Sequence, residues 1–175
     1  MGAEITSLQG HVLGLFLETT PASFRRVEST LEMIHNQGGL AVAPHPLSWL
    51  TRSISSRTLD RLAEHDGPRF DAIELANPSP AALRTRERAI RLNQERWHLP
   101  ATGSSDAHHL EHIATGWTEF EGRTAADLRE AIRTGATTAK MTAYPGMREV
   151  GLGKLAAGLA WGYSATPRKM LRRRA

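Results

Sequence analysis

The chain has 175 residues and no cysteine, and its 22 Lys and Arg against 18 Asp and Glu give a formal net charge of +4. A composition of 40% hydrophobic and 23% charged residues is typical of a globular domain, and the lack of cysteine excludes a disulfide scaffold, a thiolate zinc site and a cysteine nucleophile. No apolar run reaches the roughly 18 residues that a membrane span needs, and no signal pattern opens the chain, so we expect a cytoplasmic protein without a membrane span.

In the first half of the chain, short apolar runs alternate with amphipathic patterns of helical period. The run His11–Leu17 is continuous and apolar, which is typical of a strand buried on both faces. A capping residue followed by proline at Thr20–Pro21 predicts the start of a helix, and Gly38–Gly39 predicts its end. The other elements predicted over this half are strands at 3–6, 40–43 and 71–77 and a helix at 56–64.

The second half continues the alternation without an internal repeat or a linker. Thr124 and Asp127 resemble a capping box, and Gly135 closes the helix that follows. The elements predicted here are helices at 80–97, 124–132 and 150–161, a short run ending at Gly103, and strands at 116–120 and 136–141. Strand–helix alternation throughout predicts one α/β domain with a mainly parallel sheet, for which a barrel is one possible arrangement.

The positive charge is concentrated at the C-terminus. Residues 168–175 contain five Arg and Lys and no acid, which leaves 17 basic against 18 acidic residues in the rest of the chain. Such a basic tail can contact phosphate or another anionic surface. A solvated, frayed terminus is the simpler interpretation.

Candidate site residues follow or begin several predicted strands. His45 lies between two prolines directly after the strand 40–43, Asp106 and His108 follow the run ending at Gly103, Glu4 lies within a strand and His11 begins one. In parallel α/β folds, functional groups gather at the carboxyl ends of strands. Imidazole and carboxylate without sulfur suit Zn²⁺, Mn²⁺ or Fe. Taken singly, an Asp-x-His pair is common by chance, and a histidine between prolines is more often a turn residue.

Other polar residues near this edge have two interpretations each. Glu74 and Asn77 end the strand 71–77, where they can orient a ligand histidine from the second shell or serve as ordinary turn residues. His109 and His112 have the spacing of one helix face, but we interpret them as solvent-facing loop residues.

Five segments in order resemble motifs of the PHP (polymerase and histidinol phosphatase) superfamily. They are GAEIT at 2–6, GHVLG at 10–14, GLAVAPHP at 39–46, AIELAN at 72–77 and GSSDAH at 103–108. The resemblance implies a distorted (β/α)7 barrel with a metal cluster at the carboxyl ends of its strands. It also implies metal-dependent hydrolysis of phosphate mono- or diesters, with a small phosphorylated substrate such as a nucleotide or an oligonucleotide.

The same resemblance implies a role for each candidate residue. Glu4 would bridge two of two or three divalent metals (Zn, Mn, Fe or Mg), and His11 and His45 would complete the coordination of one of them. Asp106 would ligate the other bridged metal and His108 a third, so that Glu4, Asp106 and His108 are the residues expected to carry catalysis. Bound metals would activate water and stabilise the leaving oxygen.

The chain departs from the family pattern at its start. PHP proteins resemble one another first in a His-x-His motif, whereas this chain begins three residues before Glu4. We therefore expect a barrel incomplete at its N-terminal strands, with a PHP-like domain at 1–144 and a helix and basic tail at 145–175. We favour a piece of a longer phosphoesterase, and the alternative is a catalytically incomplete PHP-like binding module that retains one metal position.

Overall fold

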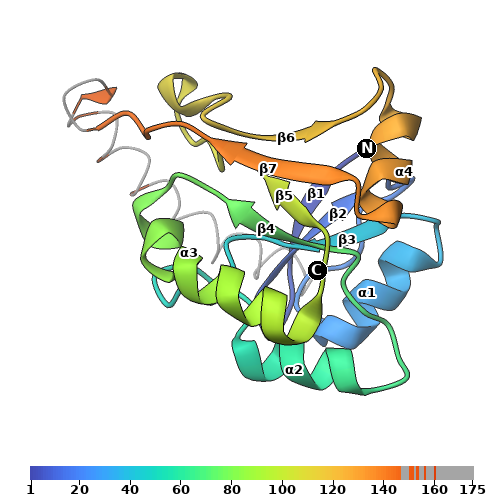
Figure 1. Cartoon of the computed structure of the whole chain (residues 1–175). Coiled ribbons are helices and arrows are strands. Elements are labelled where there is room, and N and C mark those ends of the chain that lie inside the picture. The colour runs from blue at the N-terminus through green and yellow to red at the C-terminus, as the bar shows by residue number, and fades with distance from the viewer. Residues whose placement is uncertain (147–149, 152, 154–155, 157–159, 161–175) are drawn as a thin grey trace.

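The computed structural model describes residues 1–146 together with 150, 151, 153, 156 and 160 (Figure 1). The strands are β1 (Ala3–Thr6), β2 (His11–Leu15), β3 (Leu40–Ala43), β4 (Ala72–Ala76), β5 (Ala101–Gly103), β6 (Gly116–Phe120) and β7 (Thr137–Met141). The helices are α1 (Val27–His35), α2 (Ser56–Glu64), α3 (Pro80–Leu92), which continues into a π turn (Asn93–Trp97), and α4 (Ala125–Thr134). The predicted order of elements is confirmed as far as residue 141, while most of the helix expected at 150–161 and the whole basic tail lie outside the described residues.

Five strands form one sheet in the order β1-β2-β3-β4-β5, and β6 and β7 form a separate antiparallel pair. In the larger sheet β2 is antiparallel to both of its neighbours, while β3, β4 and β5 pair in parallel. Only residues 7–10 separate β1 from β2, and so short a connection permits a hairpin but no parallel crossover. The prediction of a mainly parallel sheet is therefore wrong for β2 and for β6–β7, although β1, β3, β4 and β5 share one direction. The mixed α/β architecture is confirmed, whereas closure into a barrel stays a prediction.

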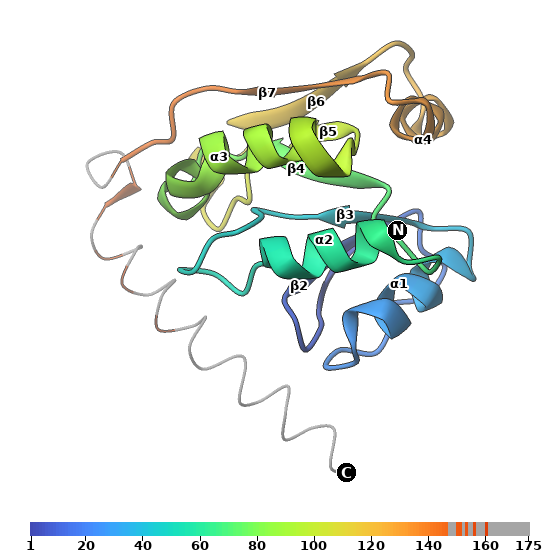
Figure 2. The same ribbon diagram turned by 60° about the horizontal axis from the view of Figure 1, so that its bottom comes forward.

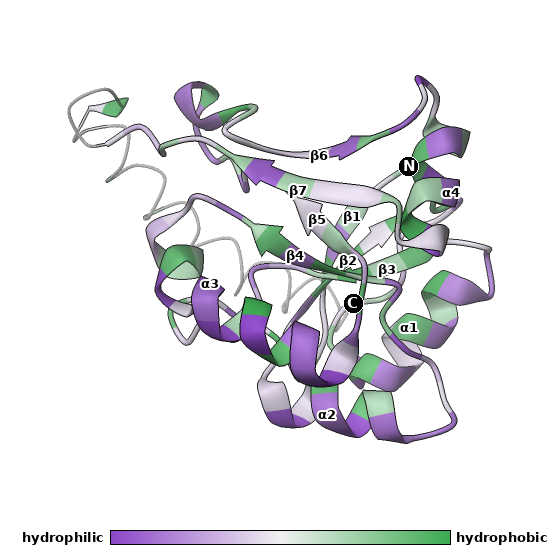
Figure 3. Cartoon of the chain, viewed as in Figure 1, coloured by the Kyte–Doolittle hydropathy of each residue, from purple (hydrophilic) through white to green (hydrophobic). Residues whose placement is uncertain are grey.

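The helices α1, α2 and α3 cover one side of the larger sheet, and β6, β7 and α4 lie on the other (Figures 1 and 2). Figure 3 shows hydrophobic residues along β3 and hydrophilic stretches on α2 and α3. Because alternate strand residues point to opposite faces, Ala41 and Ala43 join the core under α1 and α2, while Leu40 and Val42 join a smaller core with Ile132 of α4. Thus β3 is buried on both faces. Within the described residues, no helix is long and apolar enough to cross a membrane.

Two local predictions need correction. The strand β2 is fully buried on one face only, because Leu13 and Leu15 pack at the margin of the smaller core and stay half-buried. The first helix begins at Val27 rather than at Thr20–Pro21. Phe24 adopts a left-handed backbone with φ of 58°, and its N–H donates to the carbonyl of Thr6 at 2.6 Å. Because a left-handed residue interrupts a right-handed helix, the helix does not extend through Phe24. Phe24 is instead hydrogen-bonded to the end of β1.

The β6–β7 pair packs closely on β5, which requires a glycine at position 103. A Cβ at Gly103 would lie 2.3 Å from the carbonyl oxygen of Trp117. Thr118 Oγ1 accepts from the Gly103 N–H and donates to its carbonyl, both at 3.0 Å, and Thr137 Oγ1 donates to the carbonyl of Ala101 at 2.7 Å. These contacts hold the end of β5, from which the segment containing Asp106 departs.

Candidate metal centre

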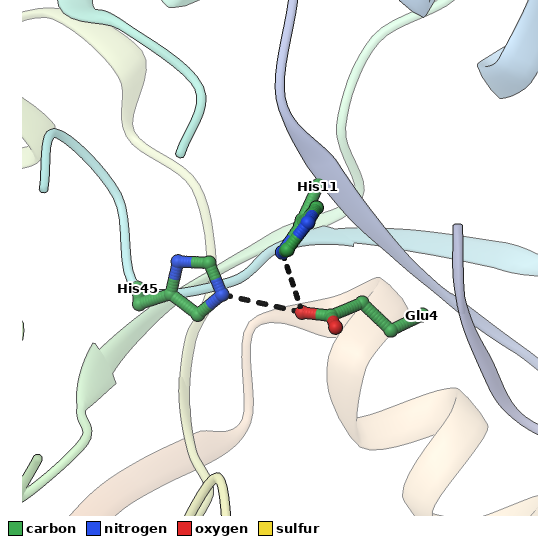
Figure 4. Close-up of side chains that lie close together, drawn as sticks. All are labelled: Glu4, His11 and His45. Atoms are coloured by element: carbon green, nitrogen blue, oxygen red, sulfur yellow. Dashed lines mark hydrogen bonds and ion pairs between the residues drawn. The ribbon is translucent and has the colours of Figure 1, made fainter. Parts of the chain in front are cut away.

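Three of the predicted ligands, Glu4, His11 and His45, come together at one edge of the larger sheet (Figure 4). Glu4 lies on β1, His11 begins β2 opposite Thr6, and His45 follows β3. Because β2 runs against its neighbours, its first residue lies at the same edge as the carboxyl ends of β1 and β3. The reversed strand, which the strand–helix alternation did not predict, therefore delivers His11 to the site.

The ligand atoms of this cluster all lie within 4.8 Å of one another. Glu4 Oε1 lies 3.1 Å from His11 Nδ1 and 3.2 Å from His45 Nε2, and the imidazole rings are 5.5 Å apart in an edge-on arrangement. The exposed fraction of the side chain rises from 3% for His45 through 21% for His11 to 44% for Glu4. His45 is thus the most buried member of the cluster, and Glu4 is the member most accessible to solvent.

The charges of this cluster are coupled. Burial raises the pKa of the Glu4 carboxyl, but contacts with His11 and His45 and the positive charge of these imidazoles outweigh burial and hold that pKa well below its usual range. Burial lowers the pKa of His45, yet the contact with Glu4 and the charges of Asp106, Glu74 and Glu4 outweigh it, so that the net direction is upward. The carboxylates surrounding His45 therefore favour a positive charge at this position.

A divalent cation fits the residues present. Two imidazole nitrogens and one carboxylate oxygen are a donor set that borderline metals such as Zn²⁺ prefer. The buried Nδ1 of His11 has no hydrogen-bond partner, although it lies 3.1 Å from Glu4 Oε1. An unsatisfied buried nitrogen facing a carboxylate is explained when both atoms are ligands of one cation.

Glu74 supports His45 through the backbone. It is 4% exposed, and its Oε2 accepts from the His45 N–H at 2.6 Å and from Asn77 Nδ2 at 2.8 Å, while its Oε1 accepts from the Ser104 hydroxyl. Burial raises the pKa of the Glu74 carboxyl, and these hydrogen bonds oppose that rise. Glu74 therefore holds the backbone of a candidate ligand, and Asn77 in turn holds the Glu74 carboxylate.

Asp106 and His108 lie outside the three-residue cluster. Asp106 adopts a left-handed backbone with φ of 48°. Burial raises the pKa of its carboxyl, the positive charge of His45 lowers that pKa, and the negative charge of Glu4 raises it. Asp106 is therefore close enough to His45 and Glu4 to interact with their charges. His108 is 71% exposed, and its Nδ1 contacts the backbone oxygen of Asp106 at 2.8 Å. The structure thus brings Asp106 near the cluster and leaves His108 in solvent.

The interpretation of His112 as a solvent-facing residue is wrong. His112 is 3% exposed, its ring centroid lies 3.8 Å from that of Tyr144, and the ring centroid of His109 lies 5.3 Å away in an edge-on arrangement. The chain after β7 folds back onto this loop, where the N–H of Thr142 donates to the carbonyl of Thr115 at 2.8 Å. Burial of His112 therefore depends on a segment 30 residues downstream, which the local sequence does not reveal.

Sequence reasoning missed two hydroxyl residues beside His45. Ser53 Oγ lies 2.8 Å and Thr51 Oγ1 3.2 Å from His45 Nδ1. The only sequence signal is that both follow the proline-flanked histidine within eight residues, and no local pattern predicts that this loop returns to the ring.

Comparisons with known proteins relate parts of this chain to a protein family, a curated relative and a solved structure. The model of a family described as PHP-associated matches residues 84–137. An uncharacterized protein of Methanocaldococcus jannaschii is 40% identical over 60 residues, which cover 34% of this chain and 35% of that protein. A crystal structure of a two-domain protein from Bacteroides vulgatus, said to contain a predicted PHP-like metal-dependent phosphoesterase, shares the fold with a TM-score of 0.60 and 22% identity. That match covers 80% of this chain and 43% of the other, so the matched part is less than half the length of each relative.

Proposed function

We propose that the chain is a PHP-like metal-dependent phosphoesterase that holds a divalent cation between Glu4, His11 and His45, as its partial match to a PHP-associated family and its shared fold suggest. The observation that supports this most directly is the convergence of three ligand atoms within 4.8 Å. Zn²⁺, Mn²⁺ or Fe²⁺ suits these ligands better than Mg²⁺, which prefers oxygen. When bound, such a cation supplies Lewis acidity, which neutralises phosphate charge and lowers the pKa of water.

In this proposal each residue of the chain has a separate task. His45 is the buried ligand, and His11 is the ligand contributed by β2. Glu4 is the most exposed of the three and faces the solvent from which a phosphate ester would approach. Asp106 would provide a further carboxylate for a second cation, and His108 would join a third position only after its exposed side chain turns inward. Glu74 and Asn77 keep His45 in place.

The substrate in this proposal is a small phosphate mono- or diester, such as a nucleotide or an oligonucleotide, hydrolysed in the cytoplasm. A hollow of about 390 Å³ is lined by residues of the loop 107–113, His108 among them, and in this proposal it would receive the rest of such a molecule. The five-stranded sheet, with four carboxyl ends at one edge, would form part of a distorted (β/α)7 barrel. The basic tail at 168–174 would attract anionic partners.

One observation favours the alternative of a binding module with a single metal position. Among the described residues, only one group of three potential ligands converges, and His108 points to solvent. A single cation without further metal positions would hold a partner or stabilise the fold without hydrolysis.

Metal analysis and hydrolysis assays on the full chain separate these functions. For an enzyme we expect two or three Zn or Mn per chain by mass spectrometry, together with hydrolysis of p-nitrophenyl phosphate. One metal without hydrolysis supports the module. His45→Ala should abolish the bound metal, whereas His65→Ala, at an exposed histidine beyond α2, should not. Absence of any bound metal after saturation, or equal loss in both variants, contradicts the assignment of the site.

A further inference from the structure

The loop after β3 returns to the His45 ring on the side opposite Glu4. Ser53 Oγ lies 2.8 Å from His45 Nδ1 and 2.7 Å from the His45 carbonyl oxygen, and Thr51 Oγ1 lies 2.7 Å from Ser53 Oγ. One serine hydroxyl therefore contacts both the ring and the backbone of the same candidate ligand.

The number of available hydrogens decides which atom donates in these contacts. A serine hydroxyl has one hydrogen, and a carbonyl oxygen can only accept, so the hydrogen of Ser53 is used on the His45 carbonyl. At His45 Nδ1 the Ser53 oxygen must then accept, which requires a hydrogen on Nδ1. Thr51 donates its own hydrogen to Ser53 Oγ. The other ring nitrogen, Nε2, faces Glu4 Oε1 at 3.2 Å, where a hydrogen joins the two atoms when no cation is present. With Nδ1–H held by Ser53, the loss of this Nε2 hydrogen leaves a neutral ring whose Nε2 lone pair is available to a cation.

The loop is held at several points, which fixes the place of Ser53. The His11 N–H donates to the Arg52 carbonyl at 2.6 Å, and the Leu47 N–H donates to the Ile54 carbonyl at 3.1 Å. A Cβ at Gly10 would lie 2.6 Å from the backbone carbon of Ser53, so the β1–β2 turn packs directly on this residue. Ser53 is thus held between the start of β2, which carries His11, and the rest of its own loop.

His45 itself adopts a strained backbone, with φ of 30°. Strained conformations of this kind persist where surrounding contacts hold them, and they concentrate at functional sites. Here the N–H of His45 is bound by Glu74 and its carbonyl by Ser53. The same serine thus secures both the backbone and the ring orientation of the ligand.

We propose that Ser53 is a positioning residue that selects the Nδ1–H tautomer of His45 and so presents the Nε2 lone pair to a cation. This inference rests on the proposed metal site. Ligand histidines generally donate their second ring N–H to a protein acceptor, and this contact orients the ring. In Ser53→Ala the acceptor is lost, and the hydroxyl of Thr51 is freed to donate to Nδ1. Nε2 then carries the hydrogen and donates to Glu4, which blocks the position of the cation.

Metal titration of the full chain by calorimetry, with Zn²⁺ or Mn²⁺ added to chelator-treated protein, tests the consequence. We expect Ser53→Ala to weaken the affinity by about 10–100-fold, as is typical for second-shell contacts. Ser53→Thr keeps the hydroxyl and should restore binding to within a few-fold of wild type. Ser48→Ala is the matched control, because Ser48 lies in the same loop, is 4% exposed and has a hydroxyl without a hydrogen-bond partner. Equal affinities for wild type and Ser53→Ala, or an equal loss in Ser48→Ala, overturn the proposal.

The tautomer is measured directly on metal-free protein by the ¹⁵N chemical shifts of the imidazole at alkaline pH. Wild type, Ser53→Thr and Ser48→Ala should have Nδ1–H at His45, and Ser53→Ala should shift toward Nε2–H. This readout is independent of the metal: if wild type binds no cation, the metal site is wrong, while the shifts still decide the role of Ser53. The same tautomer in wild type and Ser53→Ala overturns it. Circular dichroism confirms that each variant is folded.

Discussion

The carboxylate of Glu74 binds the backbone N–H of His45 at 2.6 Å. This contact joins the ends of β3 and β4, and the same carboxylate reaches the segment after β5 through Ser104. One buried acid therefore connects three consecutive strand ends of the larger sheet at the edge where the candidate ligands gather. A change at Glu74 should consequently affect the fold as well as the site.

Glu74→Ala should destabilise the protein by about 1–3 kcal/mol, because the N–H of His45 would remain buried without an acceptor. Glu74→Gln retains one acceptor oxygen and should cost less. Urea unfolding followed by circular dichroism measures both free energies. A loss below about 0.5 kcal/mol in Glu74→Ala, the range of ordinary surface substitutions, would contradict the connecting role of this carboxylate.

The ion pair between Glu28 of α1 and Arg61 of α2 predicts an acid-sensitive contribution to stability. Burial raises the pKa of the Glu28 carboxyl, but hydrogen bonds from its own backbone and from Arg61 and Arg26 outweigh it, so that the net pKa lies below its ordinary value of 4.5. A carboxyl with a lowered pKa in the folded state stabilises the protein above the unfolded pKa and loses this contribution as the pH falls through the folded pKa.

The stability of wild type should therefore fall below about pH 4.5, and Glu28→Gln should reduce the steepness of this fall. Thermal unfolding midpoints measured from pH 7 to pH 3 give the comparison. Glu64→Gln, at an exposed acid of α2, serves as the control and should follow wild type. Parallel curves for wild type and Glu28→Gln would assign the acid sensitivity to other carboxylates.

Gly103→Ala should destabilise the protein by about 1–3 kcal/mol, since the new Cβ would lie 2.3 Å from the carbonyl oxygen of Trp117 and the β6–β7 pair would have to move. Gly67→Ala is the matched control, because nothing lies within 4 Å of a Cβ at that position. Denaturant unfolding of the two variants measures the difference. Equal stability of both would indicate that the β6–β7 pair adjusts without cost.

Local patterns in the sequence were sufficient for most elements. Thr124 and Asp127 form the predicted capping box, and Gly135 ends α4 with φ of 72°. Ser55 caps α2, and Ser79 with Pro80 opens α3. Such signals depend on residues within one helical turn, so the sequence reveals them without knowledge of the fold.

The sequence by itself therefore determined the order of the elements, and its resemblance to a known family nominated candidate ligands that include Glu4, His11 and His45. Only the tertiary structure decided that β2 reverses its direction, that His108 stays in solvent and that Ser53 returns to the His45 ring. The reason is that element formation depends on neighbours in the chain, whereas the convergence of ligands depends on strand direction and loop path. These are set by the packing of residues that lie far apart in the sequence.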